Sequence, residues 1–349
     1  MGDAVGREEM KAAIYDPYLD SLGGGERYAL AFGLALSKVG WSIDLAWKSP
    51  KIKAALEDRF GFDLSGINVV KDIRRGDGYD LCFWISDGSI PSLLARKNFL
   101  HFQVPFHGVN GKTLLNRMKL FRINKVICNS SFTKRFIDEE YGVKSIVIYP
   151  PVETEKIRPG RKENIILYVG RFSALLQSKR QDVLVKAFKT FVKNYPDWKL
   201  VLAGGVEVGS EKLLKKLEKL SRGAPIGIVK SPSFKEIKRL YATSKIFWSA
   251  SGFGINETKN PEKVEHFGIT TVEAMAAKCV PIVFAAGGAK EIVKDGVDGF
   301  LWGTTRDLLR KTKKLLSTRG LMTEVSLRAL ESSSTYSYER FEKEVIGLI

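Results

Sequence analysis

The chain has 349 residues, of which 44% are hydrophobic, and a formal net charge of +17; this length predicts about two domains with buried cores. Its three cysteines are scattered and include no C-x-x-C pair, which argues against a disulfide framework and favours a reducing compartment, the cytoplasm. No run of about 18 apolar residues occurs, so we expect no membrane-spanning helix, and the polar segment 1–11 does not resemble a signal peptide.

Short apolar runs alternate with helical stretches along the chain, which predicts parallel α/β sheets. The first half contains the expected strands Ala12–Tyr15, Ser42–Trp47, Leu81–Ile85, Phe99–Phe102, Lys125–Cys128 and Ser145–Ile148, and the helices Glu26–Val39 and Ser131–Glu140. The second half contains the expected strands Ile165–Val169, Lys199–Ala203, Ile226–Val229, Ile246–Ser249 and Val280–Phe284, and the helices Gln181–Asn194, Ser210–Ser221, Lys235–Ala242 and Tyr338–Ile349. Between them, Pro150 and Pro151 interrupt regular structure and indicate a domain join near residues 150–162.

Three consecutive glycines, Gly23, Gly24 and Gly25, follow the first predicted strand and open a helix. Glycine permits positive φ angles and a close approach of the backbone to a ligand, and a helix start offers amides to a phosphate. The spacing matches neither G-x-G-x-x-G nor a Walker A loop. A plain strand–helix turn is therefore the alternative interpretation.

A histidine, His101, stands near the end of the predicted strand Phe99–Phe102. Side chains at the carboxyl ends of parallel strands face the crevice in which such sheets bind ligands. There a histidine can position or deprotonate a hydroxyl, or contact a sugar. The alternative is a hydrogen-bonded histidine inside the core.

The segment Lys112–Lys125 interleaves apolar and basic side chains. One interpretation is an amphipathic helix that lies on an anionic membrane surface. The other is a packed helix whose outer face is charged. The basic runs Lys212–Lys219 and Arg306–Lys314 are interpreted as the solvated faces of amphipathic helices.

Two cations, Arg171 and Lys179, follow the first predicted strand of the second half. Arginine binds phosphate oxygens through two N–H groups and lysine adds a point charge. Together they are suited to neutralise a departing diphosphate. Ordinary surface charge is the alternative.

Two carboxylates, Glu265 and Glu273, are separated by a Phe267-Gly268 turn, and the second enters a helix of small residues. We expect Thr270 or Thr271 to cap this helix through its hydroxyl, with the first amides forming an anion site. A sugar nucleotide matches this layout, because its two phosphates lie between ribose and sugar hydroxyls. A capped helix with two solvated glutamates is the alternative.

These segments resemble retaining glycosyltransferases of family 4, and most closely the α-1,2-mannosyltransferases that extend lipid-linked oligosaccharides. The resemblance rests on the Glu265–Glu273 segment, Pro281-Ile282-Val283 with Gly287-Gly288, the loop from Tyr15 to Arg27, Gly170-Arg171, and Lys179. It implies an α/β GT-B fold, in which two Rossmann-like domains with parallel sheets face an interdomain cleft. The implied acceptor domain is residues 1–155, the nucleotide-sugar donor domain is residues 156–335, and a terminal helix, residues 336–349, crosses back to the first domain.

The resemblance also implies a function: transfer of a hexose, mannose from GDP-mannose first of all, to a hydroxyl of a glycan or lipid-linked acceptor. The implied catalytic residues are Glu265, His101, Arg171 and Lys179. The implied donor-binding residues are Gly24, Gly25, Arg171, Lys179, Gly268, Ile269, Thr270, Thr271 and Glu273. No metal or other cofactor is expected beyond the donor, and peripheral contact with the cytoplasmic face of an anionic membrane is an additional expectation. One departure is visible, because Arg180 stands where the family usually has glycine.

Three alternatives to this function stay open. In the first, the donor is a UDP-linked hexose instead of GDP-mannose. In the second, suggested by a pI near 9.6, the protein is a basic nucleic-acid binder without catalytic activity, although no binding motif for nucleic acid is present. In the third, the chain is an inactive scaffold that binds sugar nucleotides, which the four residues Glu265, Glu273, Arg171 and Lys179 argue against.

Overall fold

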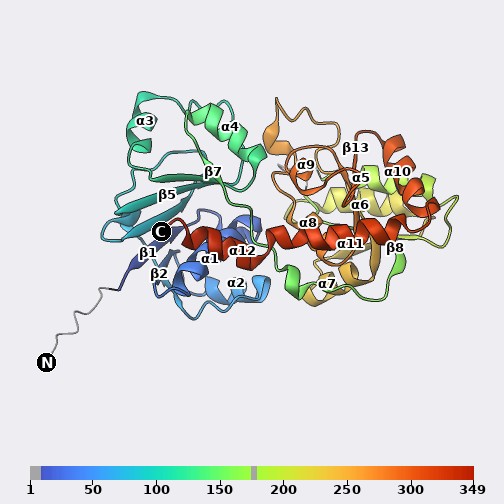
Figure 1. Ribbon diagram of the computed structural model, residues 1–349, viewed down its shortest axis with the longest axis horizontal. Coiled ribbons are helices and arrows are strands. Elements are labelled where there is room, and N and C mark those ends of the chain that lie inside the picture. The colour runs from blue at the N-terminus through green and yellow to red at the C-terminus, as the bar shows by residue number, and fades with distance from the viewer. Residues whose placement is uncertain (1–8, 174–178) are drawn as a thin grey trace. The chain divides into compact units, whose positions relative to one another are not determined.

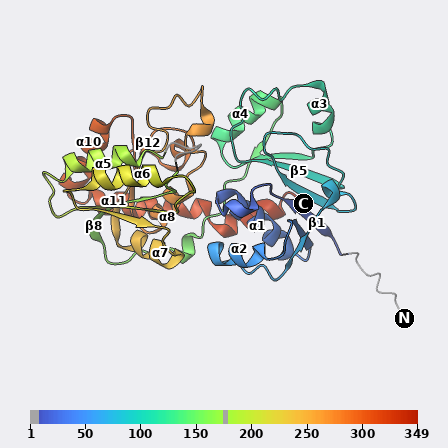
Figure 2. The ribbon, with the colours of Figure 1, turned by 180° about the vertical axis from the view of Figure 1, so that it is seen from behind.

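The computed structural model describes residues 9–173 and 179–349, which form two compact units (Figures 1 and 2). The N-terminal unit comprises the described residues up to Pro151 together with Glu339–Ile349, and the C-terminal unit comprises Val152–Tyr338. The chain therefore passes between the units twice. The two connections run side by side, because the Val152 amide donates a hydrogen bond of 2.9 Å to the Tyr336 carbonyl.

Within the described residues, the N-terminal unit contains a seven-stranded parallel sheet in the order β3-β2-β1-β4-β5-β6-β7. Its strands are β1 Lys11–Tyr15, β2 Ser42–Ala46, β3 Ile67–Val70, β4 Leu81–Ile85, β5 Lys97–Phe102, β6 Lys125–Cys128 and β7 Ile146–Val147. Its main helices are α1 Gly24–Ser37, α2 Ile52–Phe60, α3 Leu114–Leu120, α4 Ser131–Tyr141 and α12 Tyr338–Ile346. The six strands expected here are confirmed, and β3 was not predicted.

The terminal helix α12 lies beside α1 of the same unit (Figure 1). The ring of Phe341 packs edge-on against Tyr28, with 5.0 Å between centroids. Lys38 on α1 forms an ion pair with Glu342, and the Lys97 ammonium donates to the Ile349 carbonyl at 2.7 Å. These contacts confirm that the last helix returns to the first unit.

The described part of the C-terminal unit contains a six-stranded parallel sheet in the order β10-β9-β8-β11-β12-β13. Its strands are β8 Glu163–Val169, β9 Lys199–Gly204, β10 Ile226–Lys230, β11 Ser244–Ser249, β12 Val280–Phe284 and β13 Phe300–Trp302. Its helices are α5 Gln181–Phe191, α6 Glu211–Ser221, α7 Phe234–Thr243, α8 Ile269–Ala276, α9 Ala289–Ile292, α10 Thr305–Ser317 and α11 Leu321–Ser333. The predicted strands are again confirmed, with β13 in addition.

Helices cover both faces of this second sheet. In the C-terminal unit α5 and α6 lie toward the viewer in Figure 2, and α11 lies toward the viewer in Figure 1. Large side chains such as Phe188, Trp248 and Trp302 fill the core between the helices and the strands. The strand order reverses between β8 and β11, and in open α/β sheets such a reversal creates a crevice for ligands outside the carboxyl ends of the strands. In the N-terminal unit the corresponding reversal lies between β1 and β4.

The basic helices fall into two kinds. Helices α6 and α10 each bury apolar side chains, among them Leu214, Leu217, Leu308 and Leu315. Most of their lysines are exposed, which confirms the solvated faces; the exception is Lys311, which is 13% exposed and pairs with Asp295. Helix α3 buries no residue. Leu114, Leu115 and Met118 are exposed, whereas Leu120 packs against a core cluster, so both interpretations of Lys112–Lys125 stay predictions. In the described parts of the chain, every helix is too short or too polar to span a bilayer.

Candidate functional site

Two strands of the C-terminal unit, β8 and β9, end so close together that their last turns require glycine. A Cβ atom on Gly170 would lie 2.3 Å from the Tyr168 hydroxyl, and one on Gly204 would lie 2.0 Å from the Gly170 carbonyl. Both distances are far inside van der Waals contact. The close approach places Arg171 directly at the switch point of the sheet, where a ligand crevice is expected.

The guanidinium of Arg171 is paired with a carboxylate that the sequence pattern did not single out. Its Nη1 lies 2.8 Å from Oε1 of Glu207, and the Arg171 side chain is 48% exposed. Glu207 is held on the loop after β9, since its amide donates to the Phe172 carbonyl at 3.2 Å. An ion pair this exposed contributes little stability, so a doubly charged ligand can readily replace Glu207 as the partner of Arg171.

A second ion pair of the candidate site, less exposed than the first, joins Lys179 to Glu265. The Lys179 ammonium lies 2.8 Å from Oε2 of Glu265, and the two side chains are 13% and 20% exposed. Burial raises the pKa of the Glu265 carboxyl, but the charge and hydrogen bond of Lys179, with smaller contributions from His266 and Ser251, outweigh burial and leave that pKa lowered. Glu265 is therefore an ionised carboxylate that can accept hydrogen bonds from hydroxyl groups.

The residue after this lysine, Arg180, adopts a left-handed backbone conformation with φ of 47°. Glycine enters that region without strain, which explains why glycine is usual at this position of the resembled family. The arginine side chain compensates by donating to the Phe253 carbonyl at 2.8 Å and pairing with Asp182 at 3.0 Å. The loop before it, residues 174–178, lies outside the described residues.

The backbone of Glu265 is held in place by contacts with two glycines, Gly287 and Gly288. The Gly288 amide donates to the Glu265 carbonyl at 2.8 Å. A Cβ atom on Gly287 would lie 2.0 Å from the Glu265 carbonyl, and a Cβ atom on Gly288 would lie 2.4 Å from the His266 carbonyl. Only glycine therefore lets this loop support the turn that carries Glu265.

We expect Gly288→Ala to reduce activity about a hundredfold, because the displaced turn would misplace Glu265 by a fraction of an ångström or more. The unfolding free energy should fall by only about 1–3 kcal/mol. Steady-state kinetics and thermal denaturation measure the two effects. Gly303→Ala is the matched control, since a Cβ atom there meets nothing within 4 Å. Equal activity of the two variants would contradict this role of Gly288.

Helix α8 begins differently from the prediction. Its N-cap is Gly268, with φ of 116°, and this residue provides no side-chain hydrogen bond. The expectation that Thr270 or Thr271 caps the helix is therefore wrong, because both residues already lie inside it. The amides of a first helical turn lack intrahelical partners. In α8 the Thr271 amide donates to the Gly268 carbonyl at 2.9 Å. The amides of Ile269 and Thr270 thus keep the general character of an anion site.

The second carboxylate, Glu273, projects from α8 and is 8% exposed. The hydroxyl of Tyr241 donates to its Oε2 at 2.9 Å and lies 3.2 Å from the Thr270 carbonyl. Tyr241 is fully buried, and burial followed by the charge of Glu273 raises its pKa well above the usual value. The tyrosine therefore stays a neutral donor that orients Glu273.

The C-terminal unit brings most of the predicted residues together. The side-chain amide of Gln181 donates to the Arg171 carbonyl at 3.0 Å. This bond links the Arg171 turn to the start of α5 beside Lys179. Tyr168, fully buried, has its pKa raised first by burial and then by the charge of Glu265, while Arg171 acts in the opposite direction. Arg171, Lys179 and Glu265 thus surround the carboxyl end of β8.

In the N-terminal unit the backbone of the three-glycine turn lies close to neighbouring side chains. None of the three glycines has a positive φ, so the turn does not use the conformational freedom that glycine permits. A Cβ atom on Gly25 would lie 2.9 Å from Oε1 of Gln103, and the Gly23 amide donates to the Glu26 carboxylate, which caps α1. Gly24 and Gly25 form the first turn of that helix.

The ring of His101 is completely buried. It stacks on Tyr28 with 4.0 Å between centroids and lies 5.5 Å from Phe83. Burial lowers its pKa to about 3, with the Ile127 backbone acting in the opposite direction, so the imidazole is neutral. The ring exposes no atom to a substrate in this structure, and its part in catalysis stays a prediction.

Two further carboxyl groups, Asp16 and Glu26, lie buried near the end of β1. Oδ1 of Asp16 accepts from the Tyr18 amide at 2.9 Å. Burial and then the charge of Glu26 raise the pKa of Asp16 to about 7. The sequence contains both residues within the glycine-loop segment, but only their packing shows that they interact.

This raised pKa predicts a pH-dependent stability. Between pH 3.8 and about 7 the folded protein holds a proton on Asp16 that the unfolded chain has lost, so stability falls as the pH rises through this range. We expect Asp16→Asn, which stays neutral, to raise the unfolding free energy by about 1–3 kcal/mol at pH 8 and by little near pH 4. Urea denaturation at both pH values measures the change in unfolding free energy. Asp58→Asn, at an exposed position, is the control. A gain that is the same at both pH values would contradict the assignment.

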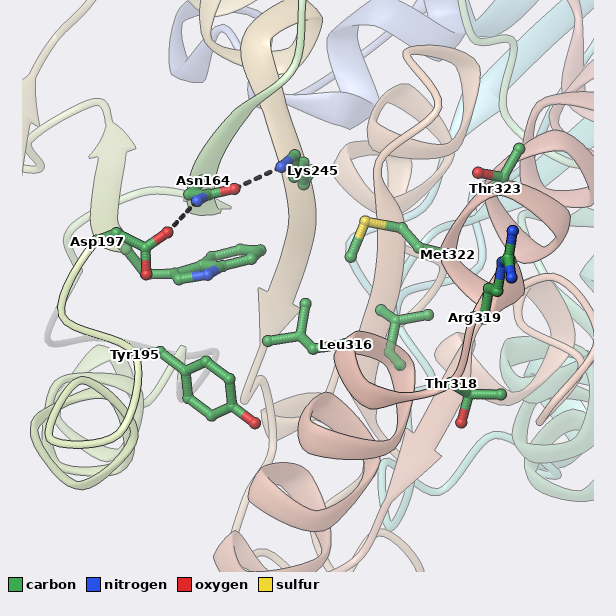
Figure 3. A pocket seen from close by; sticks show the side chains of 12 residues that line it. Asn164, Tyr195, Asp197, Lys245, Leu316, Thr318, Arg319, Met322 and Thr323 are labelled. Carbon is green, nitrogen blue, oxygen red and sulfur yellow. Dashed lines mark hydrogen bonds between the residues drawn. The ribbon is translucent and has the colours of Figure 1, made fainter.

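A surface hollow of about 420 Å³ lies at the opposite edge of the second sheet (Figure 3). Its wall includes Asn164 and Lys245, which lie near the starts of β8 and β11, and the Lys245 ammonium bonds the Asn164 amide oxygen at 2.5 Å. None of the predicted site residues lines this hollow. Among residues 9–173 and 179–349, no three His, Cys, Asp or Glu side chains are grouped to hold a metal ion.

Comparison with known proteins agrees with this geometry. The family described as Glycosyl transferases group 1 matches residues 152–330, just over half of the chain. An uncharacterised glycosyltransferase of Methanocaldococcus jannaschii is 27% identical over 293 residues, which cover 79% of this chain and 77% of that protein. The human GDP-Man:Man(3)GlcNAc(2)-PP-Dol alpha-1,2-mannosyltransferase is 29% identical over 242 residues, 62% of this chain but only 46% of the enzyme.

Solved structures confirm the GT-B fold. HepE of Anabaena, solved in complex with UDP and glucose, superposes with a TM-score of 0.76 at 18% identity, covering 97% of this chain and 99% of HepE. A glycosyltransferase of Rickettsia africae superposes with a TM-score of 0.75 at 19% identity, covering 98% of both chains.

Proposed function

This chain belongs to the glycosyl transferases group 1, a family of enzymes that act on nucleotide sugars, and from that premise we propose that it transfers mannose from GDP-mannose to a hydroxyl of a glycan or glycolipid. The ion pair between Lys179 and Glu265 beside the start of α8 is the observation that carries the proposal. It joins a cation for a diphosphate to a carboxylate for sugar hydroxyls, and so it favours an active enzyme over a nucleic-acid binder or an inactive scaffold.

The donor is proposed to bind along the carboxyl edge of the second sheet. Lys179, Arg171 and the first amides of α8 would hold the diphosphate, because each presents positive charge or an unpaired donor to it. Glu273, oriented by Tyr241, would accept hydrogen bonds from the ribose hydroxyls. Glu265, an ionised carboxylate, would accept them from the sugar.

We infer a front-face displacement that retains the anomeric configuration. The bond between the sugar C1 and the diphosphate oxygen breaks as the acceptor oxygen bonds to C1 on the same face. The acceptor proton passes to the departing diphosphate oxygen, and the free nucleoside diphosphate leaves. Lys179 and Arg171 stabilise the negative charge that develops on the leaving group, and neither glutamate acts as a nucleophile.

The N-terminal unit is proposed to bind the acceptor. The turn at Gly24 and Gly25 is proposed to contribute to donor binding, as the family resemblance implies. His101, being buried, would act by positioning Tyr28 and the end of β5. We place the reaction at the cytoplasmic face of a membrane when the acceptor is lipid-linked. The chain spans less than half of the mannosyltransferases it matches, so the acceptor is proposed only as a chemical class.

A donor screen tests the proposal. The purified protein is incubated with GDP-mannose, UDP-glucose, UDP-galactose and UDP-N-acetylglucosamine, with and without a membrane-lipid extract, and the released nucleotide is measured. Selective release from GDP-mannose is the expected result. Selective release from a UDP sugar would replace mannose by that hexose, and the absence of both release and thermal stabilisation by every donor would overturn the proposal.

A further inference from the structure

Helix α3 of the N-terminal unit and the residue after it expose most of their apolar side chains. We call Leu114, Leu115, Met118 and Phe121 the apolar face of α3; they are 75%, 60%, 65% and 94% exposed. A surface helix of a soluble domain normally turns its apolar stripe toward the core. Exposure of four large apolar side chains within eight residues therefore indicates that something else covers this face.

The surroundings of the apolar face are strongly basic. Residues 112–125 contain five basic side chains, Lys112, Arg117, Lys119, Arg122 and Lys125, and no acidic one. The absence of acidic residues extends over the whole segment 88–137, which carries nine basic side chains. The apolar face thus lies within a local concentration of positive charge that complements an anionic surface.

The segment before α3 is held in place. Three backbone amides, those of Gly108, Val109 and Gly111, donate to the Glu140 carboxylate at 2.8, 3.0 and 3.0 Å. Thr113 then caps the helix by accepting from the Asn116 amide at 3.3 Å. These bonds also occupy Glu140, which removes a neighbouring acid from the exposed surface.

The segment after α3 is equally anchored. Leu120 and Ile123 pack against the core cluster that contains Leu100 and Tyr141. The Asn98 side chain donates to the Arg122 carbonyl at 3.1 Å. Because both ends are fixed, the exposure of the apolar face reflects a defined arrangement at the edge of the unit (Figure 1).

We propose that the apolar face of α3 and its flanking cations dock the protein on an anionic lipid bilayer. The four apolar side chains enter the boundary between headgroups and acyl chains, while lysines and arginines contact lipid phosphates. A protein partner fits less well, since the centres of protein interfaces are depleted in lysine and other charged residues. The inference is independent of the donor, and it would bring the enzyme to an acceptor carried by lipid.

Vesicle flotation tests this inference on the full-length protein. Vesicles of phosphatidylcholine are compared with vesicles that also contain phosphatidylglycerol, at low and at high salt. We expect binding only to the anionic vesicles and its loss at high salt. Substitution of both Leu115 and Phe121 by serine should weaken the binding at least about tenfold. Replacement of Arg117, Lys119 and Arg122 by glutamine should weaken it roughly a hundredfold.

Two matched controls lie in the C-terminal unit. Leu327→Ser removes an apolar side chain that is 48% exposed on α11, and replacement of Lys212, Lys215 and Lys219 by glutamine removes three charges from α6. Both should bind vesicles like the wild type. Wild-type protein that fails to bind anionic vesicles, or equal binding of the α3 variants, would overturn the proposal. A dimer in solution that Phe121→Ser dissociates would also overturn it, because a second copy would then cover the face.

Discussion

Replacement of Glu265 by alanine should reduce glycosyl transfer by roughly a thousandfold. The carboxylate is ionised and lies 2.8 Å from the Lys179 ammonium. Its removal deletes the acceptor for the sugar hydroxyls and leaves a largely buried lysine without this ion pair. Because the Gly288 amide bonds the backbone carbonyl of Glu265 and not its side chain, the turn should persist. Nucleotide release and sugar incorporation measure the loss.

Thermal denaturation accompanies this measurement, and the folded variant should unfold within a few degrees of the wild type. The matched control is Glu262→Ala, a nearby glutamate whose side chain is 36% exposed and pairs only loosely, at 3.9 Å, with Lys263. Turnover of Glu265→Ala like that of Glu262→Ala would remove Glu265 from the catalytic site. Parallel losses of activity and folding would also contradict the account, since they would make the side chain structural.

Replacement of Lys179 by alanine should cost roughly 10²–10³ in kcat/KM. The Lys179 side chain is 13% exposed, and charges act more strongly on a developing anion where water is largely excluded. Arg171→Ala should cost less, because that guanidinium is 48% exposed and is held by Glu207 in the free protein. Donor titrations of the three proteins measure kcat and KM separately.

The control for these variants is Lys186→Ala, which removes an exposed lysine from α5, the helix that follows Lys179. It should behave like the wild type. A larger loss for Arg171→Ala than for Lys179→Ala would mean that the leaving group is held mainly at the end of β8. An unchanged kcat/KM in both variants would exclude the proposed site for the diphosphate.

Most of the strands could be predicted because each consists of a short apolar run bounded by turn residues. The strands that were missed are short: β3 has four residues with only Ile67 buried, and β13 has three. Neither sequence is long enough to show the alternation of apolar and polar residues that distinguishes a strand from a loop. The carboxyl ends of the predicted strands lie within one residue of the observed ends, and these ends position Arg171 and the loop that carries Glu265.

The details of the candidate site could be predicted less well, because they depend on backbone angles and on distant packing. The pattern around Glu265 suggested a threonine cap, whereas Gly268 begins α8 at a φ of 116°. The environment of His101 depends on Tyr28, which itself packs on Phe341 at the end of the chain. Likewise, the ion pair of Glu207 with Arg171 requires two loops to meet, and no local signal marks it.

The central claim is that a nucleoside diphosphate binds at the carboxyl edge of the second sheet. A crystal structure of the protein with GDP, and a second with UDP, tests this most directly. We predict the diphosphate within hydrogen-bond distance of the Lys179 ammonium and of the first amides of α8, with the ribose hydroxyls on Glu273. A nucleotide bound elsewhere, for example in the hollow beside Asn164 and Lys245, would contradict the account.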